Sequence, residues 1–324
     1  MKAINLKKFG GPEVLELIDN AIKPNITDTE VLIKVKAAGI NRPDIIQRMG
    51  LYPPPPGASD ILGLEVSGTI VEVGAKIDKD YINKDVCALL NGGGYAEYAS
   101  CDISTVLPIP KNISLIDSCT IPETFFTVWT NLFDTANISK DEVLLIHGGA
   151  SGIGLTAITI AQAMGIKCVA TVGSKDKEEY LNQLNLEMVI NYNDQDFEDL
   201  IKQKLKGVDV ILDMVGGNYF QKNINLLNRN GRLINIAYLQ GSKVNVNLLP
   251  IMLKRLVVTG STLRVRSNEE KHKIKQNIKK HIWPLFEQNI IKLHIDKYFE
   301  MKDVVKAHQY MENNKNIGKI LLKI

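Results

Sequence analysis

The chain lacks the features that mark several specialised classes of protein. No stretch approaches the roughly 18 uncharged apolar residues of a membrane-spanning helix, so we expect no membrane segment. The N-terminal residues do not form an apolar core followed by small residues, so we also expect no signal peptide. The formal net charge of +3 is too small to indicate a polyanionic partner such as nucleic acid.

Cysteine is scarce, and its four copies are scattered at Cys87, Cys101, Cys119 and Cys168. No two of them form a Cys-x-x-Cys pair, which excludes a zinc knuckle or a redox dithiol of the usual spacing. We expect buried spectator cysteines, with a single reactive thiol as the alternative. Scattered thiols and no export signal favour a cytoplasmic protein.

What is present is an ordinary globular composition, 45% hydrophobic and 23% charged, in a chain long enough for two domains. Residues 1–121 consist of short apolar runs separated by glycine and proline, which predicts a small β-rich domain. From residue 122 to residue 264 strands and helices alternate, which predicts an α/β Rossmann domain with a doubly wound parallel sheet. Residues 265–324 contain a long basic helix, expected at 268–289, and a closing strand.

Apolar runs and cap signals set the expected elements of the alternating region. Strands are expected at residues 143–147, 167–172, 188–191, 209–215, 231–238 and 255–263. Helices are expected at residues 174–185, 194–205 and 218–228, in addition to the one that follows the first strand.

The most informative stretch is VLLIHGGASGIGLTAITIAQAMGI, residues 143–166. It combines a buried strand, a glycine-rich turn and an amphipathic helix in that order. Such a turn lets the backbone approach a nucleotide pyrophosphate, and the helix presents unpaired N–H groups to the anion. The loop by itself is weak evidence, and the flanking strand and helix strengthen the prediction of a dinucleotide site.

The end of the second expected strand indicates which dinucleotide binds. An acidic residue there would favour NAD, whereas basic and hydroxyl groups favour the 2′-phosphate of NADP. Here the strand runs into Gly173, Ser174 and Lys177 without a carboxylate at its tip. We therefore predict NADPH, with Ser174 and Lys177 on the 2′-phosphate. The alternative is that Ser174 is only a helix cap and Lys177 a solvated lysine.

Several segments together are similar to the zeta-crystallin-like quinone oxidoreductases, the zinc-free branch of the medium-chain dehydrogenases and reductases. The resemblance runs along the whole chain and looks closest to the tumour-suppressor-inducible quinone oxidoreductases. The segments are AAGINRPDIIQRMGLYPPPPGASDILGLEVSGTI (37–70), HGGASGIG (147–154), VGSKDK (172–177) and GSTLRVR (260–266).

This resemblance implies a GroES-like catalytic domain, residues 1–121 completed by 265–324, interrupted by a Rossmann domain at 122–264. It implies NADPH as the reductant, a quinone or another conjugated carbonyl as the acceptor, and a homodimer joined through edge strands, here residues 255–263. One departure is Ser151, which stands where many dinucleotide folds have the second glycine of G-x-G-x-x-G.

The resemblance also implies that no catalytic zinc is bound. Zinc alcohol dehydrogenases have a cysteine ligand where this chain has Asn41 and a histidine ligand where it has Leu64. Leucine cannot bind a metal, and asparagine is a poor zinc ligand. Quinone reduction does not need a Lewis acid, because hydride addition yields a delocalised phenolate.

Three residues are expected near the reacting groups. The amide of Asn41 should donate to the acceptor oxygen as charge develops, Tyr52 should stack on a flat acceptor, and Thr127 resembles a family threonine beside the nicotinamide. Their alternative roles are a turn asparagine, a loop aromatic and a core-helix residue.

The expected cofactor-binding residues extend from the glycine turn to the C-terminal segment. Backbone N–H groups of Ser151, Gly152 and Ile153 should bind the pyrophosphate, Tyr192 should pack by the adenosine phosphate, and Asn316 should close over the cofactor. His147 and Asp213 are expected to be structural. The full expected set is Asn41, Thr127, Gly149, Ser151, Gly152, Ile153, Gly154, Ser174, Lys177, Tyr192, Gly216, Ala237, Tyr238, Leu263, Arg264 and Asn316.

Other functions remain open at this point. The same fold could reduce the carbon–carbon double bond of an enal or enone. A non-enzymatic NADPH sensor, or an RNA-binding protein using the basic helix from Lys271 to Lys280, is a further alternative. A short-chain dehydrogenase is disfavoured, because the glycine loop lies near residue 150 and no Tyr-x-x-x-Lys follows it.

Overall fold

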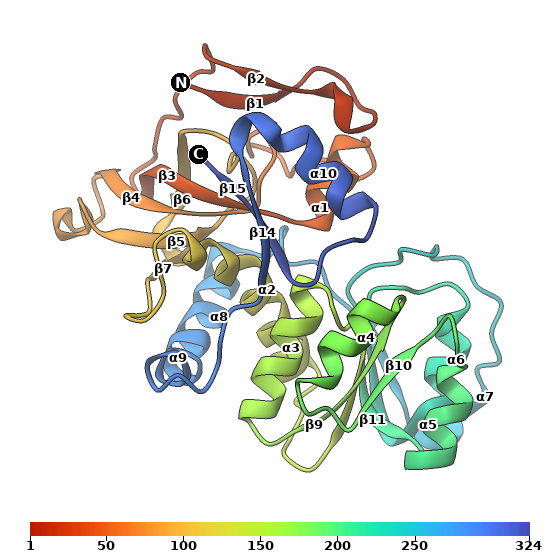
Figure 1. Cartoon of the computed structure of the whole chain (residues 1–324). Coiled ribbons are helices and arrows are strands. Elements are labelled where there is room, and N and C mark those ends of the chain that lie inside the picture. Colours follow the sequence, from red (N-terminus) through yellow and green to blue (C-terminus); the bar gives the residue numbers. More distant parts are fainter. The chain divides into compact units, whose positions relative to one another are not determined.

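The computed structural model describes residues 1–324 and divides them into two compact units (Figure 1). The first unit comprises Met1–Phe126 and Leu263–Ile324, and the second comprises Thr127–Thr262. The two divisions fall a few residues from the expected boundaries at 121 and 264. None of the helices combines the length and the apolar character that crossing a membrane requires.

The first unit is built on a seven-stranded sheet in the order β14-β15-β3-β4-β5-β7, with β6 paired to β3. Its longest strand, β3 (Glu30–Ile40), buries Ile33 and Val35 and exposes Lys34 and Lys36, the alternation expected for a strand with one face on a core. The remaining strands are β4 (Glu65–Val73), β5 (Asp85–Leu89), β6 (Tyr98–Asp102), β7 (Val106–Pro108), β14 (Ile295–Glu300) and β15 (Lys319–Lys323), with a separate ribbon of β1 (Ala3–Leu6) and β2 (Leu15–Ile18).

The C-terminal segment completes this sheet. Strand β15 pairs antiparallel with β3, so that Ile320 lies opposite Ile40 and Leu322 opposite Ala38. Ile320 and Leu322 belong to the same buried core cluster as Ile33. Residues 319–323 and residues 30–40 therefore belong to one sheet.

The helices of the first unit correct one prediction. Helix α8 (Asn268–His281) begins at a capping box of Ser267 and Glu270. The expected single helix at 268–289 is wrong, because a separate helix, α9 (Trp283–Glu287), begins after Ile282 with Pro284 near its start. Proline lacks the N–H that would continue the first helix. The other helices are α1 (Arg42–Arg48), α2 (Ile121–Val128), which ends in the second unit, and α10 (Val304–Glu312).

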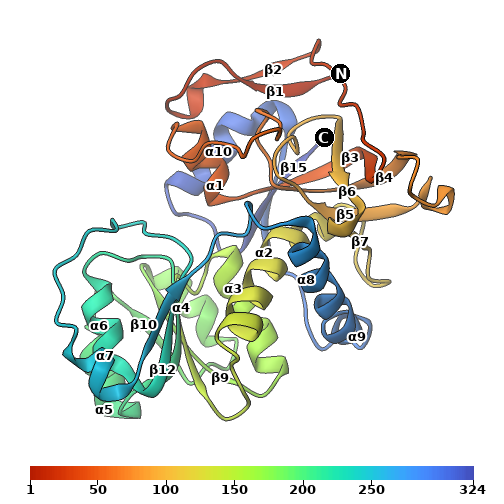
Figure 2. The same cartoon turned by 180° about the vertical axis from the view of Figure 1, so that it is seen from behind.

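The second unit contains a six-stranded parallel sheet in the order β10-β9-β8-β11-β12-β13. Strands β9, β10 and β12 of this sheet are labelled in Figure 2, which shows the molecule from behind. The first strand in sequence lies in the middle, which is the doubly wound Rossmann order and confirms the predicted fold class. Ligands bind such sheets at the carboxyl ends of the strands, near the point where the order reverses. The strands are β8 (Val143–His147), β9 (Lys167–Val172), β10 (Met188–Asn191), β11 (Val208–Asp213), β12 (Leu227–Asn235) and β13 (Val257–Gly260).

Several element boundaries in this unit differ from the expected ones. The helix expected at 194–205 begins only at Phe197, because Asp196 caps it by accepting from the backbone of Glu198 and Asp199. The helix expected at 218–228 ends at Leu226, since Leu227 is extended and starts β12. The last expected strand, 255–263, is shortened to β13. The helices are α3 (Gly152–Ala163), α4 (Lys175–Asn182), α5 (Phe197–Leu205), α6 (Tyr219–Leu226) and α7 (Leu249–Lys254), and a π-helical turn covers Trp129–Thr135.

Candidate active site

Glycines of the turn between β8 and α3 leave no room for a side chain at their positions. A Cβ atom on Gly149 would lie 2.6 Å from Ala170 Cβ, and one on Gly154 would lie 2.4 Å from the carbonyl oxygen of Gly148. Gly148 itself has a positive φ of 71°, which favours glycine. The turn therefore brings bare backbone to the start of α3, as a pyrophosphate site requires.

The hydrogen bonds at this turn correct one predicted role. The backbone N–H of Ser151 was expected to bind the pyrophosphate. It donates instead to Gly148 O at 3.0 Å and is therefore not available to a phosphate. Ser151 instead caps α3, since its hydroxyl oxygen accepts from Gly154 N at 3.0 Å. Gly152 and Ile153 supply the first N–H groups of the helix, which no carbonyl within the helix can satisfy.

The end of β9 carries residues that the sequence predicts at the adenosine end of a dinucleotide. Ser174 precedes α4 but makes no capping hydrogen bond with its side chain, which leaves that hydroxyl for another partner. Lys177 lies in the first turn of the same helix. The hydroxyl oxygen of Tyr192 lies only 2.1 Å from the position of a Cβ on Gly173, so these residues are in contact at the strand tip.

A cavity of about 400 Å³ lies at the carboxyl ends of β11, β12 and β13. Gly216 and Tyr238, both predicted cofactor residues, line it together with Asn235, Thr259 and other residues of these strand ends. Asn235 donates through Nδ2 to Thr259 O at 3.2 Å, whereas its buried Oδ1 has no hydrogen-bond partner. Ala237, the third predicted residue of this group, lies between Asn235 and Tyr238 in the chain but is not among the lining residues.

These features together fit a bound dinucleotide. The glycines of the turn have no side chains that would keep a phosphate away from the backbone N–H groups. The buried side-chain oxygen of Asn235 needs an N–H donor, which the chain does not supply. A nicotinamide dinucleotide offers both phosphates and a carboxamide N–H. Thr127, at the beginning of this unit, is buried, and its carbonyl oxygen accepts from Asn131 Nδ2 at 2.8 Å.

In the first unit, buried hydrogen bonds hold the backbone N–H and the side-chain amide of Asn41. Its backbone N–H donates to Asp44 Oδ2 at 2.8 Å, and its side-chain Oδ1 accepts from Lys319 Nζ at 2.6 Å. Its Nδ2 donates to Glu65 Oε1 at 2.9 Å and lies 3.5 Å from Gly39 O. The amide predicted to face the acceptor is thus held by a buried ion pair.

A second buried hydrogen-bond network lies around Asp44. The chemistry of its side chains determines which of them donate and which accept. Arg48 can only donate, so His308 Nδ1 accepts from Arg48 Nη1 at 3.2 Å and the ring carries its hydrogen on Nε2. Tyr95 in turn donates to Asp44 Oδ2 at 3.0 Å. Burial lowers the pKa of His308 to about 3, so that the ring is neutral at ordinary pH.

Tyr52 and Arg264, both predicted site residues, contact each other. The Cζ atom of Arg264 lies 5.4 Å from the centroid of the Tyr52 ring. The nearby carboxyl group of Glu123 joins this cluster: burial raises the pKa of Tyr52, and the charge of Glu123 raises it further. Burial, and then the carboxylate of Glu65, raise the pKa of Glu123 to about 8.

The other predicted residues of the first unit are placed as follows. Leu263 is buried beside Arg264 in the sequence, and Asn316 donates through Nδ2 to Gly318 O at 2.9 Å in the turn before β15. Leu64, which stands where zinc dehydrogenases have a histidine, is a buried core residue. No group of three or more His, Cys, Asp or Glu side chains is arranged to hold a metal ion.

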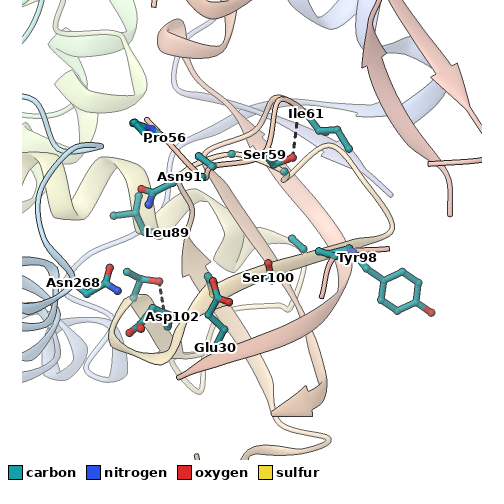
Figure 3. A pocket seen from close by; sticks show the side chains of 18 of the residues that line it. Glu30, Pro56, Ser59, Ile61, Leu89, Asn91, Tyr98, Ser100, Asp102 and Asn268 are labelled. Atoms are coloured by element: carbon teal, nitrogen blue, oxygen red, sulfur yellow. Dashed lines mark hydrogen bonds between the residues drawn. The ribbon is translucent and has the colours of Figure 1, made fainter. Parts of the chain in front are cut away.

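A separate polar cavity of about 280 Å³ lies in the first unit (Figure 3). Its lining includes Glu30, Asn91, Ser100, Asp102 and Asn268. None of the predicted site residues lines it. This cavity is therefore not the predicted acceptor site. The two places share one contact, because the backbone oxygen of Asn91, which lines the cavity, accepts from the predicted site residue Arg264.

Sequence reasoning missed Glu65, Lys319, Glu123 and Asn235. A lysine at the start of a strand or a glutamate after a buried leucine ordinarily lies in solvent. The only signal in the sequence was the charge of Lys319 at the head of the apolar run ILL, which is weak evidence of a buried partner.

The sequence is similar to known families and proteins along its length. Residues 27–111 match the family described as alcohol dehydrogenase GroES-like domain, and residues 184–322 match the family described as zinc-binding dehydrogenase. The human protein named quinone oxidoreductase is 31% identical over 278 residues, which cover 83% of this chain and 82% of that protein. The mouse protein of the same name is 29% identical, covering 99% of this chain and 97% of that protein.

Solved structures agree with this placement. The Escherichia coli quinone oxidoreductase complexed with NADPH superimposes with a TM-score of 0.87 at 28% identity, and the match covers 100% of both chains. The apo JamJ enoyl reductase also reaches a TM-score of 0.87, at 25% identity, covering 99% of this chain and 98% of that one.

Proposed function

The chain belongs to the quinone oxidoreductase family of the medium-chain dehydrogenases and reductases, and from this membership we propose that it reduces quinones or related conjugated carbonyls with NADPH. The observation that carries the proposal is the bare glycine turn from Gly148 to Gly154, leading into α3 in a chain similar to these enzymes along its whole length. It is an oxidoreductase of the nicotinamide-dependent type. No observation favours the alternative of a non-enzymatic sensor or an RNA-binding protein.

NADPH is proposed over NADH on the chemistry of the β9 tip. Gly173 leaves no carboxylate there to bind a ribose 2′-hydroxyl, and the hydroxyl of Ser174 is not used for capping. Lys177, one turn further on, adds a positive charge for a 2′-phosphate. A charge-assisted hydrogen bond of this kind is worth about 1.5–3 kcal/mol.

The reaction adds a hydride and a proton to the acceptor, converting a quinone into a hydroquinone. Reduced nicotinamide, when bound, supplies the hydride. The chain's own residues bind and orient: Gly152 and Ile153 offer N–H groups to phosphates, Tyr52 offers a flat ring to a planar acceptor, and Asn41 offers an amide N–H to the acceptor oxygen. Glu123, whose raised pKa of about 8 keeps a large share of it protonated at neutral pH, is a nearby proton source.

The reaction is proposed to proceed without catalytic zinc. A catalytic zinc ion needs about three cysteine, histidine or carboxylate ligands. Asn41 and the buried Leu64 stand at two of the positions that the resemblance assigns to such ligands, and the side-chain oxygen of Asn41 already accepts from Lys319. Metal analysis of the purified, active protein should therefore find substoichiometric zinc.

Reduction of an enone double bond is a second candidate. It is favoured by the similarity to the JamJ enoyl reductase over nearly the whole of both chains. The same hydride donor and the same oxygen-binding amide would serve a conjugated carbonyl whose β-carbon is reduced.

A homodimer is proposed through the free edge of the second sheet. Strand β13 pairs only with β12, so its outer edge has unpaired backbone groups. Val257 of this strand is exposed, and the segment before it carries further exposed apolar side chains, namely Leu248, Leu249, Met252 and Leu253. A cytoplasmic location is proposed from the scattered, buried thiols.

The test is steady-state oxidation of NADPH by the purified chain with matched panels of quinones and enones. We expect turnover with quinones, and the ratio of kcat/KM between the panels assigns the acceptor class. Binding of NADPH without oxidation by any member of either panel would contradict the proposal of an enzyme.

A further inference from the structure

A buried ion pair lies directly behind Asn41. The side chains of Lys319 and Glu65 are 6% and 0% exposed, and the ammonium group of Lys319 bonds to Glu65 Oε1. The same ammonium donates to Asn41 Oδ1 at 2.6 Å and lies 3.4 Å from Ile40 O. All three hydrogens of the ammonium group thus have an acceptor. Lys319 therefore has no hydrogen left for a bound molecule, whereas it bonds directly to the predicted site residue Asn41.

Glu65 is held just as closely. Its Oε1 accepts from Asn41 Nδ2 at 2.9 Å, and its Oε2 accepts from the backbone N–H of Glu123 at 2.8 Å. A Cβ atom on Gly39 would lie only 2.0 Å from Glu65 Oε1, so glycine at this position leaves the room that the carboxylate occupies. The position of the carboxylate is therefore set by strand β3, strand β4 and the start of α2.

The chemistry of this pair orients the Asn41 amide. Lysine can only donate and a carboxylate can only accept, so Oδ1 must face Lys319 and Nδ2 must face Glu65. One hydrogen of Nδ2 is then committed to Glu65. The other has only Gly39 O at 3.5 Å, the outer limit of a hydrogen bond, and is open to a better acceptor.

We propose that Lys319 and Glu65 are a positioning pair for the reduction, which fixes the Asn41 amide so that its second N–H faces the acceptor oxygen. This inference rests on the proposed function, because it needs an acceptor whose oxygen gains charge. An ion pair buried for folding alone can be replaced by neutral groups at little cost in stability. A positioning pair cannot be replaced without loss of rate, even if the fold survives.

The double variant Glu65→Gln/Lys319→Met separates these two cases. It removes both charges at once and leaves no uncompensated ion. The oxygen of the introduced glutamine would accept from the Glu123 N–H, so its NH₂ group would face Asn41. The Asn41 amide is then expected to turn over and to present its oxygen, instead of an N–H, to the acceptor. The stability of the double variant should stay near that of the wild type while kcat falls.

A cycle with Asn41→Ala tests whether the pair acts through Asn41. Loss of one oxyanion donor costs on the order of a hundredfold in kcat, and we expect Asn41→Ala and the double variant each to lose about that much. The triple variant should match Asn41→Ala within about twofold, since the pair has nothing left to position. The inference would be overturned if the two losses of kcat multiplied in the triple variant, or if the double variant kept a kcat near that of the wild type.

Lys275→Met is the matched control for loss of a buried lysine. Lys275 is also buried in this unit, but its Nζ donates to Ile103 O at 2.8 Å, away from Asn41. This variant should keep the wild-type kcat. If the double variant does not fold, Glu65→Gln alone replaces it, with a loss of kcat expected and an unchanged kcat counting against the inference.

A readout without turnover uses the cofactor-free protein labelled with ¹⁵N-asparagine. The side-chain NH₂ signals of Asn41, identified by their absence in Asn41→Ala, should shift in the double variant and not in Lys275→Met. Unmoved signals would reject the pair as the orienting element. If the wild type reduces no acceptor, the proposed function fails, yet these spectra still test the orientation.

Discussion

The guanidinium group of Arg264 lies over the ring of Tyr52, with 5.4 Å between Cζ and the ring centroid. Two of its nitrogens, Nε and Nη2, donate to Asn91 O at 2.9 and 2.6 Å, whereas the buried Nη1 has no hydrogen-bond partner. A buried unpaired N–H is costly, and the face of an aromatic ring offsets part of that cost. Arg264 therefore holds the ring of Tyr52, the residue predicted to stack on a planar acceptor.

This contact predicts the effect of changing Tyr52. Tyr52→Ala should raise the KM for a quinone about two- to twelvefold, because stacking of a planar acceptor on an aromatic ring is worth about 0.5–1.5 kcal/mol. Tyr52→Phe keeps the ring and should stay within about twofold of the wild type. Steady-state kinetics with one quinone at saturating NADPH provides the measurement, and an equal rise of KM in both variants would assign the role to the hydroxyl instead.

A second prediction concerns the choice of nucleotide. Lys177→Ala should weaken NADPH binding about ten- to a hundredfold and leave the weaker binding of NADH unchanged, since only the 2′-phosphate is lost as a partner. Lys175→Ala, at the exposed first position of α4, is the neighbouring control. Fluorescence titration with both nucleotides measures the Kd values, and equal weakening of both would exclude the phosphate role.

A third prediction concerns pH and the stability of the second unit. Arg232 bonds both oxygens of Glu142, at 2.6 and 2.8 Å, and these bonds lower the pKa of Glu142 below its ordinary value of 4.5. The ionised form therefore stabilises the fold above that ordinary value, and the contribution is lost as the pH falls through the lower, folded-state pKa.

Glu142→Gln should accordingly lower the free energy of unfolding by about 1 kcal/mol at pH 7 and by less and less as the pH falls below about 4. Urea unfolding at a series of pH values measures the difference. Glu187→Gln, at an exposed position, should show no such trend. If the difference in the free energy of unfolding between the two proteins stayed constant with pH, the charge of Glu142 would not be what stabilises the fold.

A fourth prediction concerns assembly. Val257→Lys places a charge on the exposed edge strand β13 and should convert a dimer into a monomer of 36.0 kDa. Val71→Lys, at a partly exposed position of β4 in the other unit, should leave the mass unchanged. Sedimentation velocity distinguishes the two states, and a wild-type chain that sediments as a monomer would rule out this interface.

The fold could be predicted from local patterns where those patterns are strong. The strand, turn and helix around Gly149 follow from period and glycine spacing, and the structure has β8 and α3 where they were expected. Element ends were less predictable, since they depend on single side chains. Asp196 moves one helix start, and Pro284 divides one expected helix into two.

The site was predictable only where its residues are close in sequence. Asn41 could be singled out from its own segment, but its partners could not. Lys319 lies 278 positions away along the chain, and only the pairing of β15 with β3 brings the two together. A single sequence carries no trace of that pairing beyond a lysine before an apolar run.

The ammonium group behind Asn41 also limits how this site could be converted to metal chemistry. Asn41→Cys and Leu64→His would supply two zinc ligands, yet a divalent ion bound there would lie next to a buried positive charge with little water to screen it. Lys319 would have to be exchanged as well, after which Glu65 could turn from a counter-ion into a ligand. Engineering a metalloenzyme from this scaffold is thus a problem of the C-terminal strand as much as of the ligand loop.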